Sequence, residues 1–375
     1  MPTLRETVSV LDRLYDPRWA DDWDAVGTVA GDPDAAVSRI LFAVDPVRAV
    51  VEEAIEWGAD LVVTHHPLHL KGVTSVAATT PKGRVVHDLI SHGIALHTCH
   101  TNADSPPLGV SESMALALGL QDLAPLEADV DAVDGWVVYV PTAEATAVAA
   151  AMHDAGAGAI GDYDRVFFRS EGTGSFRPRE GAVPAIGAVG QVEEVAEVRV
   201  EMVAARAVRE RVRAAMRTAH PYEEVAHQVV EIDPGGRRRG SGRVGTLAES
   251  MTLADFADHV VRALPAHRSA TRVAGDPAST VRTVALCGGS GDFLLSRADA
   301  AGADVYVTSD LRHHPVSEHR ERPGACAVVD VPHWAAEWTW LPVAAREVAA
   351  ALGDTVETRV STIVTDPWTM ALIAH

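Results

Sequence analysis

Two similar segments, far apart in the chain, each predict an apolar strand that ends in polar residues. The first is GADLVVTHHP, residues 58–67, and the second is GADVYVTSDLRHHP, residues 302–315. Side chains at the end of a buried strand are held rigidly and face a crevice. Imidazoles placed there in pairs indicate metal binding. The repetition also favours a fold built from two related halves.

The order of the expected elements predicts an α/β fold. Thr3 and Glu6 have the spacing of a capping box, so a helix is expected to begin there. A strand over 40–44, a helix over 47–57 and a strand over 61–63 form a βαβ unit with a parallel sheet. The same order returns over residues 284–330. We therefore predict two related βαβ-containing halves that form one discontinuous domain.

A different unit is expected between these halves. Strands and helices between residues 136 and 232 follow the order β-α-β-β-α-β, which is typical of an inserted ferredoxin-like α+β domain. Residues 233–236 (DPGG) are predicted to be a linker. The predicted domains are residues 1–129, the insert 130–238, and residues 239–375.

The composition excludes several classes of protein. The net charge of the 375-residue chain is −20, which argues against a nonspecific nucleic-acid-binding protein. The three cysteines are scattered and indicate no disulfide framework, as expected in a reducing compartment. There is no signal-peptide pattern and no apolar stretch long enough to span a bilayer. We therefore predict a cytoplasmic protein that binds no membrane.

Three polar clusters follow expected strands and contain the candidate metal ligands. Adjacent side chains in an extended backbone point apart, so His65 and His66 are better placed for two neighbouring metals than for one. His333 and Glu337 have the i, i+4 spacing that places both on one helix face. With Asp104, these residues give a nitrogen and oxygen ligand set that suits Zn, Mn, Fe or Co. Two metals bridged by a carboxylate would activate water for attack on an ester, amide or ring carbon.

Each cluster also has a simpler interpretation. A His-His-Pro run is often a polar loop, and His313-His314-Pro315 fits that description. An i, i+4 pair such as His333 and Glu337 is often a surface contact within a helix. Three such clusters, each following an apolar strand, favour the metal site over these alternatives.

Taken together, these motifs resemble one known family. The sequence is similar to the NIF-three family of dinuclear-metal proteins, also called GTP cyclohydrolase 1 type 2 homologues. The resemblance covers nearly the whole chain. The matching stretches are 64–67 (THHP), 100–104 (HTNAD) with Gly109-Val110 after it, 288–291 (GGSG), 309–314 (SDLRHH), 333–337 (HWAAE) and 365–368 (TDPW).

The resemblance implies roles for individual residues. One divalent metal would be held by His65 and Asp104 and the other by His66 and His333, while Glu337 would bridge both. The two ions would be Zn, Fe or Mn. His100 and His313 match positions that line the cavity, so they are the candidate catalytic acid or base residues. The resemblance also implies a PII/CutA-like insert, which includes residues 220–224 (HPYEE), and a homohexamer built as a trimer of dimers.

Two positions depart from the family pattern. Ala25 stands where the family usually has Asn, and Pro332 stands before His333 where the family prefers Gly. Proline removes a donor and stiffens the backbone. Neither change affects a proposed ligand, so we expect metal binding to be retained, while the choice of substrate is less certain.

Two functions follow from these expectations. The first is a metal-dependent hydrolase of the GTP cyclohydrolase 1 type 2 kind, acting on a nucleotide or another phosphorylated small molecule. Residues 288–291 lack the Lys of a P-loop, so metals rather than such a loop would bind phosphate. The alternative is a non-enzymatic metal-trafficking or regulatory assembly, in which the insert senses a ligand or builds the oligomer.

Overall fold

The computed structural model describes residues 1–129, 132–161, 163–232 and 239–372. The chain divides into two compact units, which we call the discontinuous unit (1–129 with 238–375) and the insert (130–237). The expected linker, 233–236, lies outside the described residues. Within the described ranges, no helix combines the length and apolarity that crossing a membrane requires.

The discontinuous unit contains a five-stranded sheet that is parallel except at one edge. Its strand order is β1-β4-β3-β2-β17, and only the edge strand β1 is antiparallel to its neighbour. The strands are β1 Gly27–Ala30, β2 Arg39–Ala43, β3 Leu61–Thr64, β4 Ala95–Thr98 and β17 Glu357–Val360. The apolar runs of the central strands β2, β3 and β4 are buried on both faces, as expected for a parallel sheet, whereas the edge strands β1 and β17 are partly exposed.

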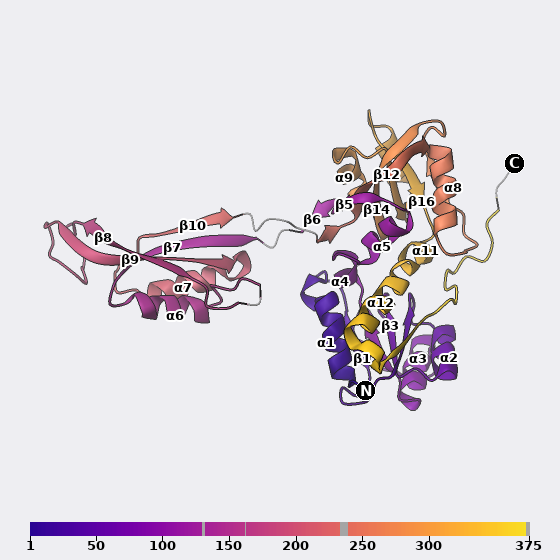
Figure 1. Cartoon of the computed structure of the whole chain (residues 1–375), viewed down its shortest axis with the longest axis horizontal. Helices are drawn as coiled ribbons and strands as arrows, with labels where there is room; N and C mark the ends of the chain where they lie inside the picture. Colours follow the sequence, from indigo (N-terminus) through magenta and orange to yellow (C-terminus); the bar gives the residue numbers. More distant parts are fainter. Residues whose placement is uncertain (130–131, 162, 233–238, 373–375) are drawn as a thin grey trace. The chain divides into compact units, whose positions relative to one another are not determined.

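Helices cover both faces of this sheet (Figure 1). The helices α2 (Arg48–Trp57) and α3 (Pro81–Ser91) lie on one face, and α1 (Leu4–Leu14) and α12 (Trp340–Leu352) lie on the other. The expected capping box starts α1: Glu6 N donates to Thr3 Oγ1 over 3.2 Å, and Thr3 N donates to Glu6 Oε2 over 2.8 Å. This part of the prediction is confirmed.

A six-stranded mixed sheet forms the other half of the discontinuous unit. Its order is β13-β16-β15-β14-β12-β5, and β14, β15 and β16 are parallel. The strands are β5 Gln121–Ala124, β12 Arg243–Thr252, β13 Arg272–Ala274, β14 Thr280–Ser290, β15 Val305–Ser309 and β16 Ala327–Asp330. The helices of this half are α8 Leu253–Ala263, α9 Leu295–Ala300 and α10 His313–Arg320. A short pair, β6 (Glu127–Ala128) with β11 (Gly240–Ser241), lies where the chain leaves and re-enters the unit.

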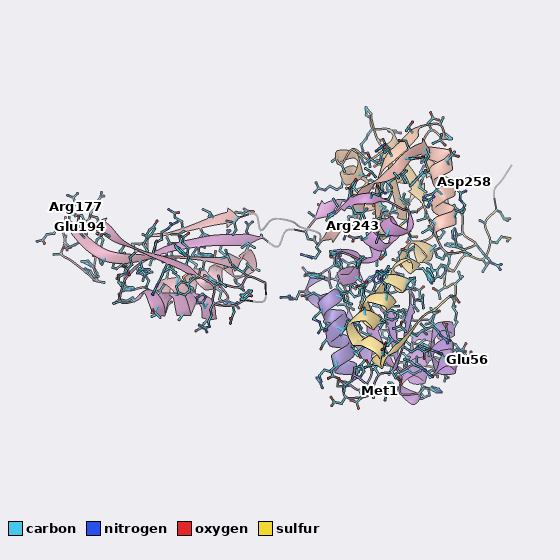
Figure 2. All side chains as sticks on the ribbon, viewed as in Figure 1. Met1, Glu56, Arg177, Glu194, Arg243 and Asp258 are labelled. Carbon is cyan, nitrogen blue, oxygen red and sulfur yellow. The ribbon has the colours of Figure 1, made fainter. Side chains whose placement is uncertain are left out.

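One hydrophobic core joins the two sheets. It includes residues of β2, β3, β14 and β15 together with α5 (Val110–Ala117), α11 (His333–Trp338) and α12. Figure 1 shows α5, α11 and α12 following one another through the middle of this unit. Arg243 is fully buried beside this core, where its guanidinium pairs with Glu112 and with four backbone carbonyls (Figure 2). The pairing offsets the cost of burying the charge.

The insert has its own sheet and its own core. Its elements are β7 Val133–Pro141, α6 Ala145–Asp154, β8 Phe168–Phe176, β9 Glu193–Ala205, α7 Arg209–Ala219 and β10 His227–Ile232. The sheet order is β10-β7-β9-β8, and every neighbouring pair is antiparallel. The helices α6 and α7 cover one face, where Trp136, Met152 and Met216 are buried. The strand β8 runs from Phe168 to Phe176 through two glycines, whose low strand propensity conceals most of it in the sequence.

Candidate metal centre

The candidate ligands follow the carboxyl ends of three strands. His65 and His66 come directly after β3, and Asp104 ends the short helix α4 (Thr101–Asp104), which follows β4. His333 and Glu337 lie on α11, the helix that follows β16. Since β3 and β4 are parallel neighbours, their carboxyl ends meet at one edge of the sheet. Helix α11 adds the ligands of the second half.

The carboxylate of Glu337 lies at the centre of this cluster. Its Oε1 is 2.7 Å from His333 Nε2 and 3.4 Å from His65 Nε2, and its Oε2 is 3.1 Å from His66 Nε2. Asp104 Oδ1 lies 3.7 Å from His65 Nε2. The structure therefore brings together all five residues that the sequence suggested as metal ligands, and both oxygens of Glu337 face imidazole nitrogens.

The other ring nitrogen of each histidine is held by an acceptor. His66 Nδ1 is 2.7 Å from Asp45 Oδ1, and His333 Nδ1 is 2.7 Å from Asp310 Oδ2. His65 Nδ1 lies 3.0 Å from the carbonyl oxygen of Cys99. A ring that donates through Nδ1 keeps the lone pair of Nε2 free, and these partners orient that lone pair toward Glu337.

Sequence reasoning missed these orienting carboxylates. Asp45 and Asp310 follow the ends of β2 and β15, and Asp24 similarly accepts from His100 Nδ1 over 2.7 Å. Asp310 has a φ of 59°, in the left-handed region that residues other than glycine rarely adopt and that is enriched at functional sites. Their position after buried strands is the signal that could have revealed them.

Several polar atoms of the cluster are buried without a partner. Among the described residues, Asp104 Oδ1, His333 Nε2 and Glu337 Oε2 find no hydrogen-bond donor or acceptor of suitable geometry. Buried polar atoms are normally satisfied, so three unsatisfied ones at a single point are the pattern expected of a cation site. Imidazole and carboxylate donors fit Zn, Fe or Mn, and the residues present therefore fit a metal site.

The charges of the cluster are strongly coupled. Burial favours the neutral acid, but His66, His333 and His65 hold the pKa of Glu337 well below its usual value. Burial and the nearby charge of Glu337 raise the pKa of Asp104 well above its usual value. Burial disfavours protonated imidazoles, yet Glu337 and the orienting aspartates raise the pKa of His66 to about 10 and that of His333 to about 11. Without a metal, protons therefore occupy the positions that a cation would take.

The absence of a side chain at Gly289 leaves room for the carboxylate of Glu337. The φ of Gly289 is +71°, and a Cβ there would lie 2.6 Å from Glu337 Oε1 and 3.5 Å from His333 Nε2. Gly288 and Gly289 belong to the end of β14, although a run of glycines is more typical of a turn. Only a glycine fits this conformation and this close approach.

The two candidate catalytic histidines lie in different places. The ring of His100 is 5.1 Å from that of His65 and 5.7 Å from that of His66, so it adjoins the cluster. The structure does not bring His313 into the cluster. It is exposed in the first turn of α10, contacts the ring of His314, and lines a separate pocket with Arg272 and Arg320.

A cavity of about 840 Å³ opens beside the cluster. His66, His100 and His333 line it together with Asp45 and Asp310. Its remaining wall includes aromatic, cationic and polar side chains, among them Arg272, Trp334, Thr365, Asp366 and Trp368. The site can therefore admit a ligand with polar groups directed at the histidines.

This fold and cluster define an α/β protein with a candidate dinuclear metal centre. The profile of the Duf34/NIF3 (NGG1p interacting factor 3) family matches residues 2–367, and the chain belongs to this family. A Mycobacterium leprae protein named GTP cyclohydrolase 1 type 2 homolog is 47% identical, over 98% of this chain and 95% of its own length.

Solved structures agree with this assignment. A Bacillus cereus protein related to NIF3 is 35% identical and has a TM-score of 0.70, with 99% of both chains covered. A Staphylococcus aureus protein is 28% identical and has a TM-score of 0.78, again with 99% of both chains covered. The family resemblance suggested by the sequence motifs is confirmed.

Proposed function

We propose that the protein is a dinuclear divalent-metal protein. One ion would be held by His65 and Asp104 and the other by His66 and His333, with Glu337 bridging both. The observation that carries the proposal is the position of Glu337, whose two oxygens face imidazoles from both halves of the unit. Zn, Fe and Mn all suit this ligand set.

We further propose that the centre supports hydrolysis of a nucleotide or another phosphorylated small molecule. The names of the curated relatives and the cavity beside the cluster support this substrate class. Metal ions bound there would lower the pKa of water, to about 7 in the best zinc sites. His100, oriented by Asp24 and facing the cavity, would transfer the proton. A catalytic role for His313 remains a prediction.

The proposal extends to the architecture. The parallel strands β2-β3-β4 in one sheet and β14-β15-β16 in the other support two related halves. The sheet order β10-β7-β9-β8, with both helices on one face, supports a ferredoxin-like, PII/CutA-like insert. Self-association as a homohexamer, a trimer of dimers, is part of the proposal and rests on the family alone.

A second candidate function is non-enzymatic metal trafficking or regulation. The observation that favours it is a second cavity, of about 630 Å³, which lies within the insert. Tyr222, Glu223 and Glu224 of the HPYEE run line it together with Phe176 and Arg199. In this alternative the insert senses a ligand and the centre carries metal without turnover.

Metal analysis of the Glu337→Ala variant tests the centre. We expect anaerobically purified protein to hold at least two ions per chain, two of them at this centre, and the variant to lose at least one, because both ions of the centre would share this carboxylate. Glu56→Ala, on the exposed surface of α2, is the matched control (Figure 2). Circular dichroism checks that both variants fold. Unchanged metal content in Glu337→Ala would disprove the ligand assignment.

Turnover separates the two functions. The metal-loaded protein is incubated with nucleotides, phosphate esters and cyclic esters, and products are followed by chromatography. Turnover that His100→Gln abolishes while both ions remain bound would support the hydrolase. Metal that exchanges freely, without turnover of any of these compounds, would support the regulatory alternative.

A further inference from the structure

A second group of possible metal ligands lies outside the centre described above. Asp299 lies on α9, His319 on α10, and Cys326 immediately before β16. Each offers one ligand atom, and these atoms lie within 4.8 Å of one another. The group is at the amino end of β16, whereas His333 follows its carboxyl end. None of these residues belongs to the proposed dinuclear centre.

The hydrogen bonds of His319 leave one ring nitrogen without a partner. His319 is 0% exposed, and its Nε2 lies 3.0 Å from the carbonyl oxygen of Cys326. A carbonyl only accepts, so Nε2 carries the proton and Nδ1 has a free lone pair. Among the described residues, Nδ1 has no hydrogen-bond partner, and Asp299 Oδ2 lies 3.5 Å away. A lone pair that faces a carboxylate inside a protein is unfavourable, so either a proton or a metal ion is expected between His319 Nδ1 and Asp299 Oδ2.

The third side chain supplies sulfur. Cys326 is buried, with its Sγ 3.7 Å from His319 Nε2, and its backbone N–H donates to Asp299 Oδ1 over 3.0 Å. Burial and the carboxylate of Asp299 raise the pKa of the thiol to about 12, so the metal-free site holds a neutral thiol. A bound metal would displace that proton, as it does at other cysteine sites. Sulfur, imidazole and carboxylate together are the donor set of zinc.

The surrounding charges are compatible with a divalent ion. Arg322 Nη1 lies 3.6 Å from Asp299 Oδ2, and Arg320 donates to the carbonyl of Cys326 over 2.8 Å. A thiolate and a carboxylate would together balance the two charges of the ion, and Arg322 would remain paired with the carboxylate. The side chain of Asp299 is 23% exposed, so the ion can reach the site, and water can complete its coordination, from that side.

We propose that Asp299, His319 and Cys326 bind one thiophilic divalent cation, of the zinc class, through Oδ2, Nδ1 and Sγ. The bound ion fastens α9 and α10 to the amino end of β16. It is a third ion in the chain, and it is chemically distinct because the dinuclear centre offers only nitrogen and oxygen.

Cobalt(II) tests the proposal, because cobalt bound to a thiolate gives a charge-transfer absorption band that nitrogen and oxygen ligands do not give. Titration of the metal-free full chain is expected to produce this band, and the band should account for one of the equivalents of cobalt bound per chain. Cys326→Ser is expected to remove the band and one equivalent of bound cobalt. Glu337→Ala is expected to keep the band, so failure of the dinuclear centre and failure of this site are distinguishable.

Cys287→Ser is the matched control. Cys287 is also buried, and burial together with the charges of Asp104 and Glu337 raises the pKa of its thiol to about 12, so it is the cysteine to exclude as the source of a band at the dinuclear centre. Absence of the band in the unmodified chain, or its loss in Cys287→Ser but not in Cys326→Ser, would overturn the proposal. If Cys326→Ser does not fold, the Asp299→Asn variant tests the site instead. We expect its affinity for cobalt, measured from the growth of the band, to fall at least about tenfold. An unchanged affinity would also overturn it.

Discussion

Replacing Asp45 by Asn changes the partner of a proposed ligand and leaves the ligand itself intact; Asp45 also accepts from Thr365 Oγ1 through its other oxygen. Asp45 Oδ1 and Asp310 Oδ2 lie at the same distance, 2.7 Å, from Nδ1 of His66 and His333, respectively. The substitution keeps the shape of the side chain and an acceptor oxygen, but it removes the charge that strengthens the hydrogen bond. Loss of such an orienting partner typically costs about 10–100-fold in metal affinity.

The burial of each aspartate determines how large the loss of metal affinity should be within this range of about 10–100-fold. The side chain of Asp45 is 24% exposed and that of Asp310 is 59% exposed, so water screens the second pair more strongly. We therefore expect Asp45→Asn to weaken binding by about 100-fold, or about 2.7 kcal/mol, and Asp310→Asn by about 10-fold. Both variants act on the ion of His66 and His333, so the affinity of the ion at His65 and Asp104 should change less.

The assay is titration of metal-free protein with zinc against a competing chelator, which resolves the two affinities. Asp258→Asn, on the exposed surface of α8, is the matched control (Figure 2). If Asp45→Asn bound both ions as tightly as the Asp258→Asn control, the orienting role would be refuted. A larger loss in Asp310→Asn than in Asp45→Asn would refute the argument from burial.

Three further outcomes follow from the same geometry. Gly289→Ala should lower the metal content, because the new Cβ meets Glu337. It should also lower the free energy of unfolding, by about 1–2 kcal/mol from the left-handed backbone alone. Metal analysis measures the first effect and urea unfolding the second. The pKa values of His66 and His333 are raised in the folded, metal-free protein, so their protonation stabilises it fully at a pH below about 6.5, the pKa of an unfolded histidine; this stability is lost as the pH rises through about 10 and 11. Thermal melting with a chelator from pH 6 to 10 should therefore show a falling melting temperature, and a rise would contradict the argument. Arg243→Met should destabilise the fold by about 3–5 kcal/mol, since it leaves a buried carboxylate and several carbonyls unpaired; a urea midpoint unchanged from the parent chain would contradict this.

Most residues of the candidate metal centre could be predicted because they lie directly beside strong strand signals. His65 and His66 follow an uninterrupted apolar run, and His333 and Glu337 have a helical spacing that fixes their common face. Only the order of parallel strands is then needed to bring them together. The family motifs supplied the pairing of ligands with individual ions.

The orienting aspartates could not be predicted in the same way. Asp45 and Asp310 each follow a strand, but their distance in sequence from His66 and His333 carries no information about which imidazole they face. That pairing depends on the neighbours of β2 and β15 in their sheets. His313 shows the converse, because its motif resembles that of His65 but it lies four residues beyond β15, in the first turn of a helix. Such a displacement turns a side chain away from the strand end.

If Glu337 bridges both ions as proposed, it also determines when during synthesis the protein can bind metal. Asp104 and His333 are separated in the sequence by the whole insert, so the ribosome must complete almost the entire polypeptide before both ions have their ligands. Loading of this pair is therefore an event of the finished chain. Each ion would then stabilise the fold only after synthesis, and cells starved of metal would contain full-length protein that is more readily degraded.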